Sequence, residues 1–179
     1  MQVAVIISAC CPDSTTFHFH WASMGLENYS FKETANGLKR YPAATNDFRD
    51  SSYAVEVWLF GEQIARSNHT FIGAAYALTC GDTYRTDDEV KGIRIYCIND
   101  YDSAHPANAD ITDYFHVADA SFPSVVPRKG NGTFHSPGAK TYFYLQRKPT
   151  LGSLHRFVVV ATLNNNRRVR DTTDDLILR

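Results

Sequence analysis

The chain has 179 residues, 44% of them hydrophobic and 13% aromatic, which is enough for one domain with its own core. Its 18 Lys and Arg residues against 19 Asp and Glu leave a formal net charge of -1, so no basic surface for nucleic acid is predicted. No run of 18 or more apolar residues occurs, so no membrane-spanning helix is predicted either.

The N-terminus has the pattern of an export signal. The apolar run 3–7 is followed by the small residues Ser8 and Ala9, as at the end of a signal peptide. Residues 7–10, ISAC, resemble the bacterial lipobox, whose cysteine, here Cys10, becomes the lipidated first residue of the mature protein. A buried N-terminal strand is the alternative. We therefore expect a signal-peptide remnant at 1–9, a lipidated tether at 10–16 and a β-sandwich domain at 17–179.

Three further cysteines are candidates for a disulfide, because export implies an oxidising compartment. They are Cys11, Cys80 and Cys97. Cys97 shares a predicted strand face with Ile93 and Ile95, which favours its interpretation as a small buried hydrophobic residue. The preferred pair is then Cys11 with Cys80.

Strand patterns occupy most of the remaining chain. The apolar run 156–163 and the returning segment 169–178 predict a hairpin, because Asn164 to Asn166 tolerate the positive φ of a tight turn. Asp110 is the expected N-cap of a single helical turn ending at Phe115, and 118–140 reads as a long loop. The predicted strands are 17–21, 53–60, 71–79, 92–98, 141–145, 156–163 and 169–178, the last one interrupted around 172–175.

Some seven short strands separated by turns predict the fold class. We expect an all-β protein, a single antiparallel β-sandwich of immunoglobulin-like type, with long loops and at most one or two short helical turns. A closed barrel is the alternative.

The first predicted strand has the sequence FHFHW, which also occurs on the zinc-binding strand of α-class carbonic anhydrases. In a strand, Phe17, Phe19 and Trp21 would line one face as a core strand, and His18 and His20 the other, facing water. The two histidines are candidate zinc ligands, but a zinc site needs at least three protein ligands. The resemblance places a third histidine a little over twenty residues further on, where this chain has none.

Other candidate sites rest on weaker sequence patterns. Asp100 and Asp102 could supply oxygen ligands for calcium, although a solvated turn is the alternative, because Asp favours turns. The remaining histidines form no pair with metal-ligand spacing. No serine nucleophile elbow, phosphate loop or dinucleotide fingerprint occurs. The sequence therefore predicts no catalytic residue, no bound metal and no cofactor.

The chain as a whole resembles a family of small lipoproteins of unknown function from Bacteroidota bacteria. The resemblance is carried by the ISACC start and by the blocks 75–80, 93–101, 105–115, 148–149 and 155–159. It implies an exported, non-enzymatic lipoprotein of the cell envelope, expected at the outer membrane and facing the periplasm or the surface. Its expected partners are the membrane, through the lipid anchor, and an unknown protein or glycan. A zinc-dependent lyase or hydrolase that uses the FHFHW strand is the alternative.

Overall fold

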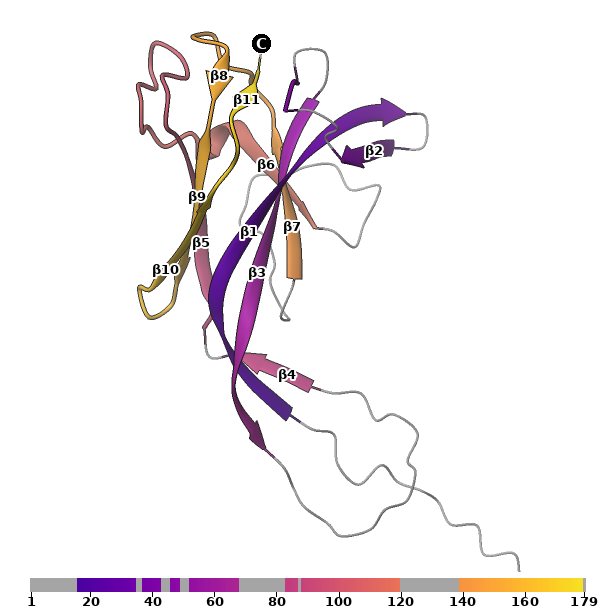
Figure 1. Ribbon diagram of the computed structural model, residues 1–179, viewed down its shortest axis with the longest axis vertical. Helices are drawn as coiled ribbons and strands as arrows, with labels where there is room; N and C mark the ends of the chain where they lie inside the picture. The colour runs from indigo at the N-terminus through magenta and orange to yellow at the C-terminus, as the bar shows by residue number, and fades with distance from the viewer. Residues whose placement is uncertain are drawn as a thin grey trace, which may run out of the picture.

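The protein is described by a computed structural model that covers residues 16–34, 37–42, 46–48, 52–67, 83–86, 88–119 and 139–178 (Figure 1). About two thirds of these residues are in strands, and the described part of the chain has one 3-10 turn, η1, over Thr112–Tyr114. None of the described residues form a helix that is long and apolar enough to cross a membrane. The strands are β1 (Thr16–Thr34), β2 (Gly37–Pro42), β3 (Ser52–Ser67), β4 (Thr83–Thr86), β5 (Val90–Cys97), β6 (Phe115–Asp119), β7 (Ala139–Leu145), β8 (Leu154–His155), β9 (Phe157–Leu163), β10 (Arg168–Thr172) and β11 (Leu176–Ile177).

Two sheets form the sandwich. The first has the order β2-β1-β3-β7-β6, with β4 added to β1, and the second has the order β10-β9-β5. If the seven strands β1, β3, β5, β6, β7, β9 and β10 are lettered A to G in chain order, the sheets read A-B-E-D and G-F-C. That is the strand order of a constant-type immunoglobulin domain. The predicted all-β sandwich of immunoglobulin-like type is confirmed, although β1 and β4 pair in parallel.

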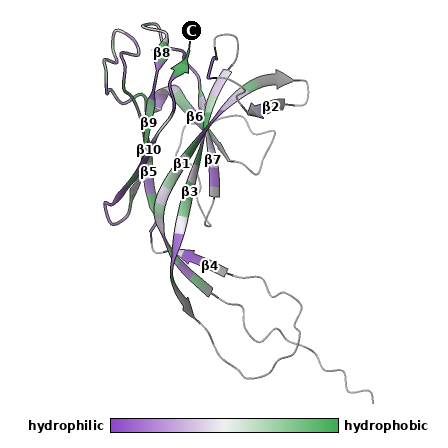
Figure 2. Ribbon diagram, in the orientation of Figure 1, coloured by the Kyte–Doolittle hydropathy of each residue, from purple (hydrophilic) through white to green (hydrophobic). Residues whose placement is uncertain are grey.

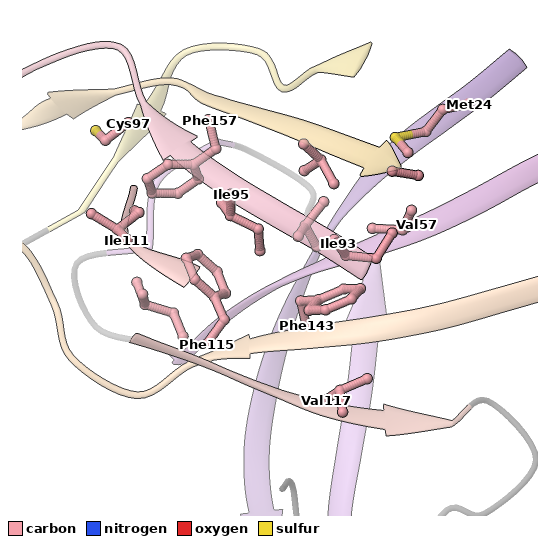
Figure 3. Packing of buried hydrophobic residues seen from close by; sticks show 14 of the residues in the cluster. Met24, Val57, Ile93, Ile95, Cys97, Ile111, Phe115, Val117, Phe143 and Phe157 are labelled. Atoms are coloured by element: carbon pink, nitrogen blue, oxygen red, sulfur yellow. The ribbon is translucent and has the colours of Figure 1, made fainter. Parts of the chain in front are cut away.

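The core lies between the two sheets. Along β9 the burial alternates, and Phe157, Val159, Ala161 and Leu163 are all fully buried. This is the period-2 pattern of a strand with one inward face. Figure 3 shows Phe157 and Ile95 from the second sheet packed over Phe115 and Phe143 from the first. Figure 2 shows hydrophobic residues along the paired strands and a hydrophilic turn between β9 and β10.

The two longest strands extend past the second sheet. β1 and β3 continue beyond it as a two-stranded ribbon, and β4 pairs there with the N-terminal end of β1 (Figure 1). The pairing of β1 with β3 shifts between His18 and Phe19, and again between Trp21 and Ser23. The first shift is a bulge at Ile64 of β3, and the second is a bulge at Ala22 of β1. Phe19 and Trp21 are in the core as predicted, whereas Phe17, in the part of β1 that pairs with β4, is half-buried.

The C-terminal hairpin has the predicted form. β9 and β10 are antiparallel neighbours, and Asn166 in the turn adopts a φ of 63°. The returning strand stops at Thr172 and pairing resumes at Leu176, as the interruption in the sequence pattern indicates. The predicted helical turn is present as η1, but its N-cap is Ile111 and not Asp110. The carboxylate of Asp110 still accepts the backbone N–H of Thr112, at 2.9 Å. The predicted strand 71–79 lies outside the described residues.

Candidate functional site: a pocket between two loops

A pocket of about 580 Å³ lies where the loop after β5 meets the loop that leads into β8. Both loops are at the end of the sandwich near β8 and β11 (Figure 1). The volume is in the range of sites that hold small organic ligands, and the pocket is a shallow one that is largely open to solvent. The pocket is lined by Ile98, Asn99, Asp100, Ala107, Leu151, Gly152, Ser153 and Leu154.

Tyr101 holds the two loops together. Its side chain is fully buried, and its hydroxyl donates a hydrogen bond to the carbonyl of Arg147. Its own carbonyl accepts the backbone N–H groups of Thr150 and Leu151, at 3.0 and 3.2 Å. Burial raises the pKa of Tyr101 far above its usual value, so its hydroxyl stays a donor. The walls of the pocket are thus fixed relative to each other by one residue of the first loop.

The first loop is also closed on itself. Asn108, with a φ of 65°, donates its N–H to the carbonyl of Cys97 at 2.6 Å. Asp100 accepts the N–H of Ala107 at 2.7 Å through Oδ1. Asn tolerates this left-handed conformation better than most residues do, and Asp commonly closes turns by such bonds.

The pocket presents apolar and polar groups side by side. Leu151 and Leu154 are 44% and 48% exposed, which is unusual for two leucines three residues apart. Asn99 and Asp100 are exposed beside them, and Ser153 is half-buried. An organic ligand with an apolar part and several hydrogen-bonding groups fits this lining.

A cysteine and a histidine are buried behind the pocket. Cys97 Sγ lies 3.6 Å from His155 Nδ1, and both residues are fully buried. His155 Nε2 has no hydrogen-bond partner in the described part of the chain. A Cβ added to Gly152, which lines the pocket with a φ of +68°, would lie 3.9 Å from Nε2. The edge of the imidazole is therefore directly below the glycine in the pocket wall.

Both groups of this pair are held uncharged. Burial lowers the pKa of His155, partly opposed by the backbone carbonyls of Leu151 and Gly152. Burial also raises the pKa of the Cys97 thiol. A reactive cysteine needs a lowered pKa and some exposure, and Cys97 has neither. The pair is therefore a neutral polar contact and not a thiolate nucleophile with its base.

A second polar cluster shapes the first loop. His105 Nδ1 lies 2.8 Å from Asp102 Oδ1, and the hydroxyl of Tyr114 donates to Asp102 Oδ2 at 2.9 Å. Asp102 also accepts the backbone N–H groups of Ala104 and His105, each at 2.9 Å. These bonds, His105 foremost, lower the pKa of Asp102 to about 2. The carboxylate accepts bonds on both oxygens, from its own loop and from Tyr114. It therefore holds the loop against Tyr114.

The sequence-predicted metal ligands do not come together. His18 and His20 are half-buried on β1, in the part paired with β3 and β4, and His20 Nε2 lies 3.6 Å from Glu62 Oε2. Asp100 and Asp102 are engaged in the turn contacts above. Across the described ranges, no group of three or more His, Cys, Asp or Glu side chains is placed to hold one metal ion.

The predicted cysteine roles are only partly visible. Cys97 is a free, buried cysteine, in keeping with its interpretation as a small buried hydrophobic residue and not as a disulfide partner. Cys10, Cys11 and Cys80 lie outside the described residues. Lipidation of Cys10 and the pairing of Cys11 with Cys80 remain predictions.

Sequence reasoning did not find the pocket, because its residues come from two loops and match no motif. One local signal was present: in the segment Leu151-Gly152-Ser153-Leu154, two leucines flank a glycine in a loop. Apolar residues at a turn that no strand pattern explains indicate either a contact or an exposed apolar surface.

Comparison of the chain with protein-family models, with curated proteins and with solved structures finds no match. The fold and the pocket are therefore the basis for the function proposed below.

Proposed function

We propose that this protein is a non-enzymatic binding domain of the cell envelope, tethered to the membrane by lipid on Cys10. The observation that carries the binding role is the pocket between the loop after β5 and the loop before β8. Its exposed leucines and its neighbouring polar groups favour capture of an organic ligand of mixed polarity. An immunoglobulin-like sandwich suits this role, because loops at the end of a rigid sandwich commonly carry binding sites.

The chemistry at the pocket favours binding over catalysis. The nearest thiol, that of Cys97, is fully buried and has a raised pKa. The nearest imidazole, that of His155, is also fully buried and is separated from the pocket by Gly152. The His105–Asp102 pair is committed to loop structure and does not line the pocket. These groups favour a ligand that is held and released unchanged.

The binding role is tested by filling the pocket. In a screen of organic fragments by ligand-observed NMR, the wild-type chain should give hits that are lost in Ala107→Trp, because Ala107 lines the pocket. The matched control is Ala104→Trp, which places the same side chain on an exposed residue of the same loop outside the lining. If no fragment distinguishes Ala107→Trp from Ala104→Trp, the pocket is not a binding site.

The tether is tested separately. A single acyl chain binds membranes marginally, so stable anchoring requires the several chains that bacterial lipoproteins carry. Expressed with a complete signal peptide, the wild-type chain should fractionate with membranes, and Cys10→Ser should move to the soluble fraction. Cys11→Ser is the control, since the neighbouring cysteine is not the proposed lipid acceptor. Identical fractionation of Cys10→Ser and wild type would exclude the anchor.

A further inference from the structure

The outward face of the first sheet carries a buried carboxylate. Glu56, on β3, is 0% exposed although it points away from the core. The hydroxyl of Tyr142 donates to its Oε1, and Lys140 Nζ lies 3.6 Å from the same oxygen. Its neighbours in register are Tyr142 on β7 and Glu27 on β1. A carboxylate is costly to bury unless its oxygens have partners.

Two hydrogen-bonding atoms on this face have no partner. Glu56 Oε2 is buried without a donor, and the indole Nε1 of Trp58 is buried without an acceptor, as judged over the described residues. Glu56 and Trp58 are two residues apart on β3, so their side chains lie on the same face of the strand. Buried polar atoms are paired in the great majority of cases, and each exception calls for an explanation. Here one atom requires a donor and its neighbour requires an acceptor.

Aromatic rings surround these two atoms. Tyr29 and Tyr142 are in edge contact with a centroid separation of 5.7 Å, and Trp58 and Phe60 are 5.9 Å apart. Phe60 is 39% exposed. The face is therefore an aromatic strip of Tyr29, Trp58, Phe60 and Tyr142 around a carboxylate.

Lys140 covers part of the aromatic strip. Its ammonium lies 3.5 Å from the centre of the Trp58 ring, and its side chain is 39% exposed. A partly exposed lysine can swing into water, but this leaves the buried carboxylate of Glu56 without its charged partner, so the movement requires a ligand that takes its place. When Lys140 moves, the ring face of Trp58 and the carboxylate of Glu56 are opened together.

The charge on this face restricts the ligand. Glu27 is exposed directly opposite the buried Glu56, and Tyr29 donates to Glu27 at 3.2 Å. Burial, followed by the charges of Glu56 and Glu27, raises the pKa of Tyr29 to about 12. Among the described side chains next to Glu56 there are two carboxylates and one ammonium, so this part of the face disfavours an anionic ligand.

We propose that the aromatic strip binds a neutral saccharide. A sugar hydroxyl is both a donor and an acceptor, so vicinal hydroxyls can serve Glu56 Oε2 and Trp58 Nε1 at once. The apolar face of a pyranose ring covers an aromatic ring as well, which removes apolar surface from water. The saccharide displaces Lys140 from Trp58, and the ammonium is left free to donate to a further hydroxyl. This site is separate from the loop pocket and does not depend on it.

The test uses the whole chain and four neutral probes: cellohexaose, maltohexaose, xylohexaose and the hexamer of N-acetylglucosamine. Binding is measured by calorimetry and by tryptophan fluorescence. The fluorescence change reports Trp58, because the other tryptophan, Trp21, is fully buried and bonded to Asp88. At least one probe should bind and shift the fluorescence, whereas trigalacturonate and tetramethylammonium should not.

Conservative variants distinguish this site from incidental binding. Glu56→Gln should weaken the binding of that probe about tenfold or more, because it removes a bond to a charged acceptor. Trp58→Phe keeps a ring but removes the N–H, and should weaken binding by about threefold or more. The matched control is Glu62→Gln, on the same strand with a side chain 71% exposed, which should bind as wild type does.

Two results would overturn the proposal. One is the absence of binding by all four neutral probes, and the other is binding that Glu56→Gln and Trp58→Phe leave at the wild-type level. A fluorescence response to tetramethylammonium alone would assign the strip to an organic cation instead. Thermal unfolding of each variant verifies that it is folded. Both variants are expected to fold, because Glu56→Gln keeps the shape of the side chain and Trp58→Phe removes a buried N–H that lacks an acceptor among the described residues.

Discussion

Trp21 and Asp88 are joined by two hydrogen bonds that connect the first sheet to the second. The indole Nε1 of Trp21 donates to the carbonyl of Asp88 at 2.8 Å, and the backbone N–H of Trp21 donates to the Asp88 carboxylate at 3.2 Å. From the turn between β9 and β10, Arg167 donates to Asp88 Oδ2 at 2.7 Å and to the carbonyl of Trp21. Asn165 in the same turn donates to Asp88 Oδ1 at 2.9 Å. Asp88 thereby accepts the hydrogen bonds of Trp21 at the β1 bulge and holds the hairpin turn against that bulge.

The first prediction concerns this aspartate. Asp88→Asn should lower the free energy of unfolding by about 2–3 kcal/mol, because an amide NH₂ would then face the donors of Trp21 and Arg167 in a nearly buried site. The midpoint of urea unfolding measures the change, provided that its slope is the same as in wild type. Asp174→Asn, at an exposed aspartate, is the control and should leave the midpoint in place. Equal midpoints for the two variants would mean that the Asp88 bonds do not stabilise the fold.

The second prediction compares two glycines that face aromatic rings. A Cβ at Gly61 would lie 2.5 Å from Cδ2 of Phe19, which is 3% exposed and packed against Trp21 at 4.9 Å. A Cβ at Gly25 would lie 2.9 Å from the tip of Phe60, which is 39% exposed and can rotate away. Gly61→Ala should therefore cost about 1–3 kcal/mol, whereas Gly25→Ala should be near neutral.

Thermal unfolding of the two alanine variants, measured side by side, tests this difference. Because both substitutions reduce the freedom of the unfolded chain by the same amount, the difference between them reports the contact with the ring alone. A Gly61→Ala variant as stable as Gly25→Ala would show that Phe19 can move aside.

The sequence pattern predicted the sandwich for a physical reason. The alternation in 92–98 is visible in the residues themselves, and the apolar run 156–163 has the length and the β-branched composition of a strand. The turn at Asn164 to Asn166 was equally local, because positive φ is a property of the residue type. Features that depend on one strand and its adjacent turn were therefore predictable.

Features that depend on contacts between distant segments could not be predicted from the sequence. The bulge in β1 between Trp21 and Ser23 is stabilised by Asp88 and Arg167, which are 67 and 146 residues away from Trp21. The burial of Glu56 depends likewise on Tyr142 and Lys140 on another strand. Within the segment 53–60, Glu56 is simply the charged residue of an otherwise apolar and aromatic strand. The pocket has the same origin, because its two loops are far apart in the sequence and are joined through Tyr101.

The last prediction is a pH dependence from His155. Burial lowers its pKa in the folded state below the usual 6.5, so the unfolded chain binds more protons than the folded chain between these two values. The free energy of unfolding should therefore fall as the pH is lowered through 6.5, and this loss should level off below the folded-state pKa. For one proton the slope is at most about 1.4 kcal/mol per pH unit.

Replacement of the imidazole isolates this contribution. His155→Phe keeps a ring beside Tyr101, 5.7 Å away in wild type, but has no group that titrates. Urea unfolding of the variant between pH 7.5 and 5 should thus have a shallower pH dependence than wild type, whatever its absolute stability. His116→Phe, at a half-buried histidine on β6, is the matched control and should retain the wild-type slope. An unchanged slope in His155→Phe would mean that His155 accepts its proton in the folded protein, with Cys97 and the pocket wall rearranged around a charged ring.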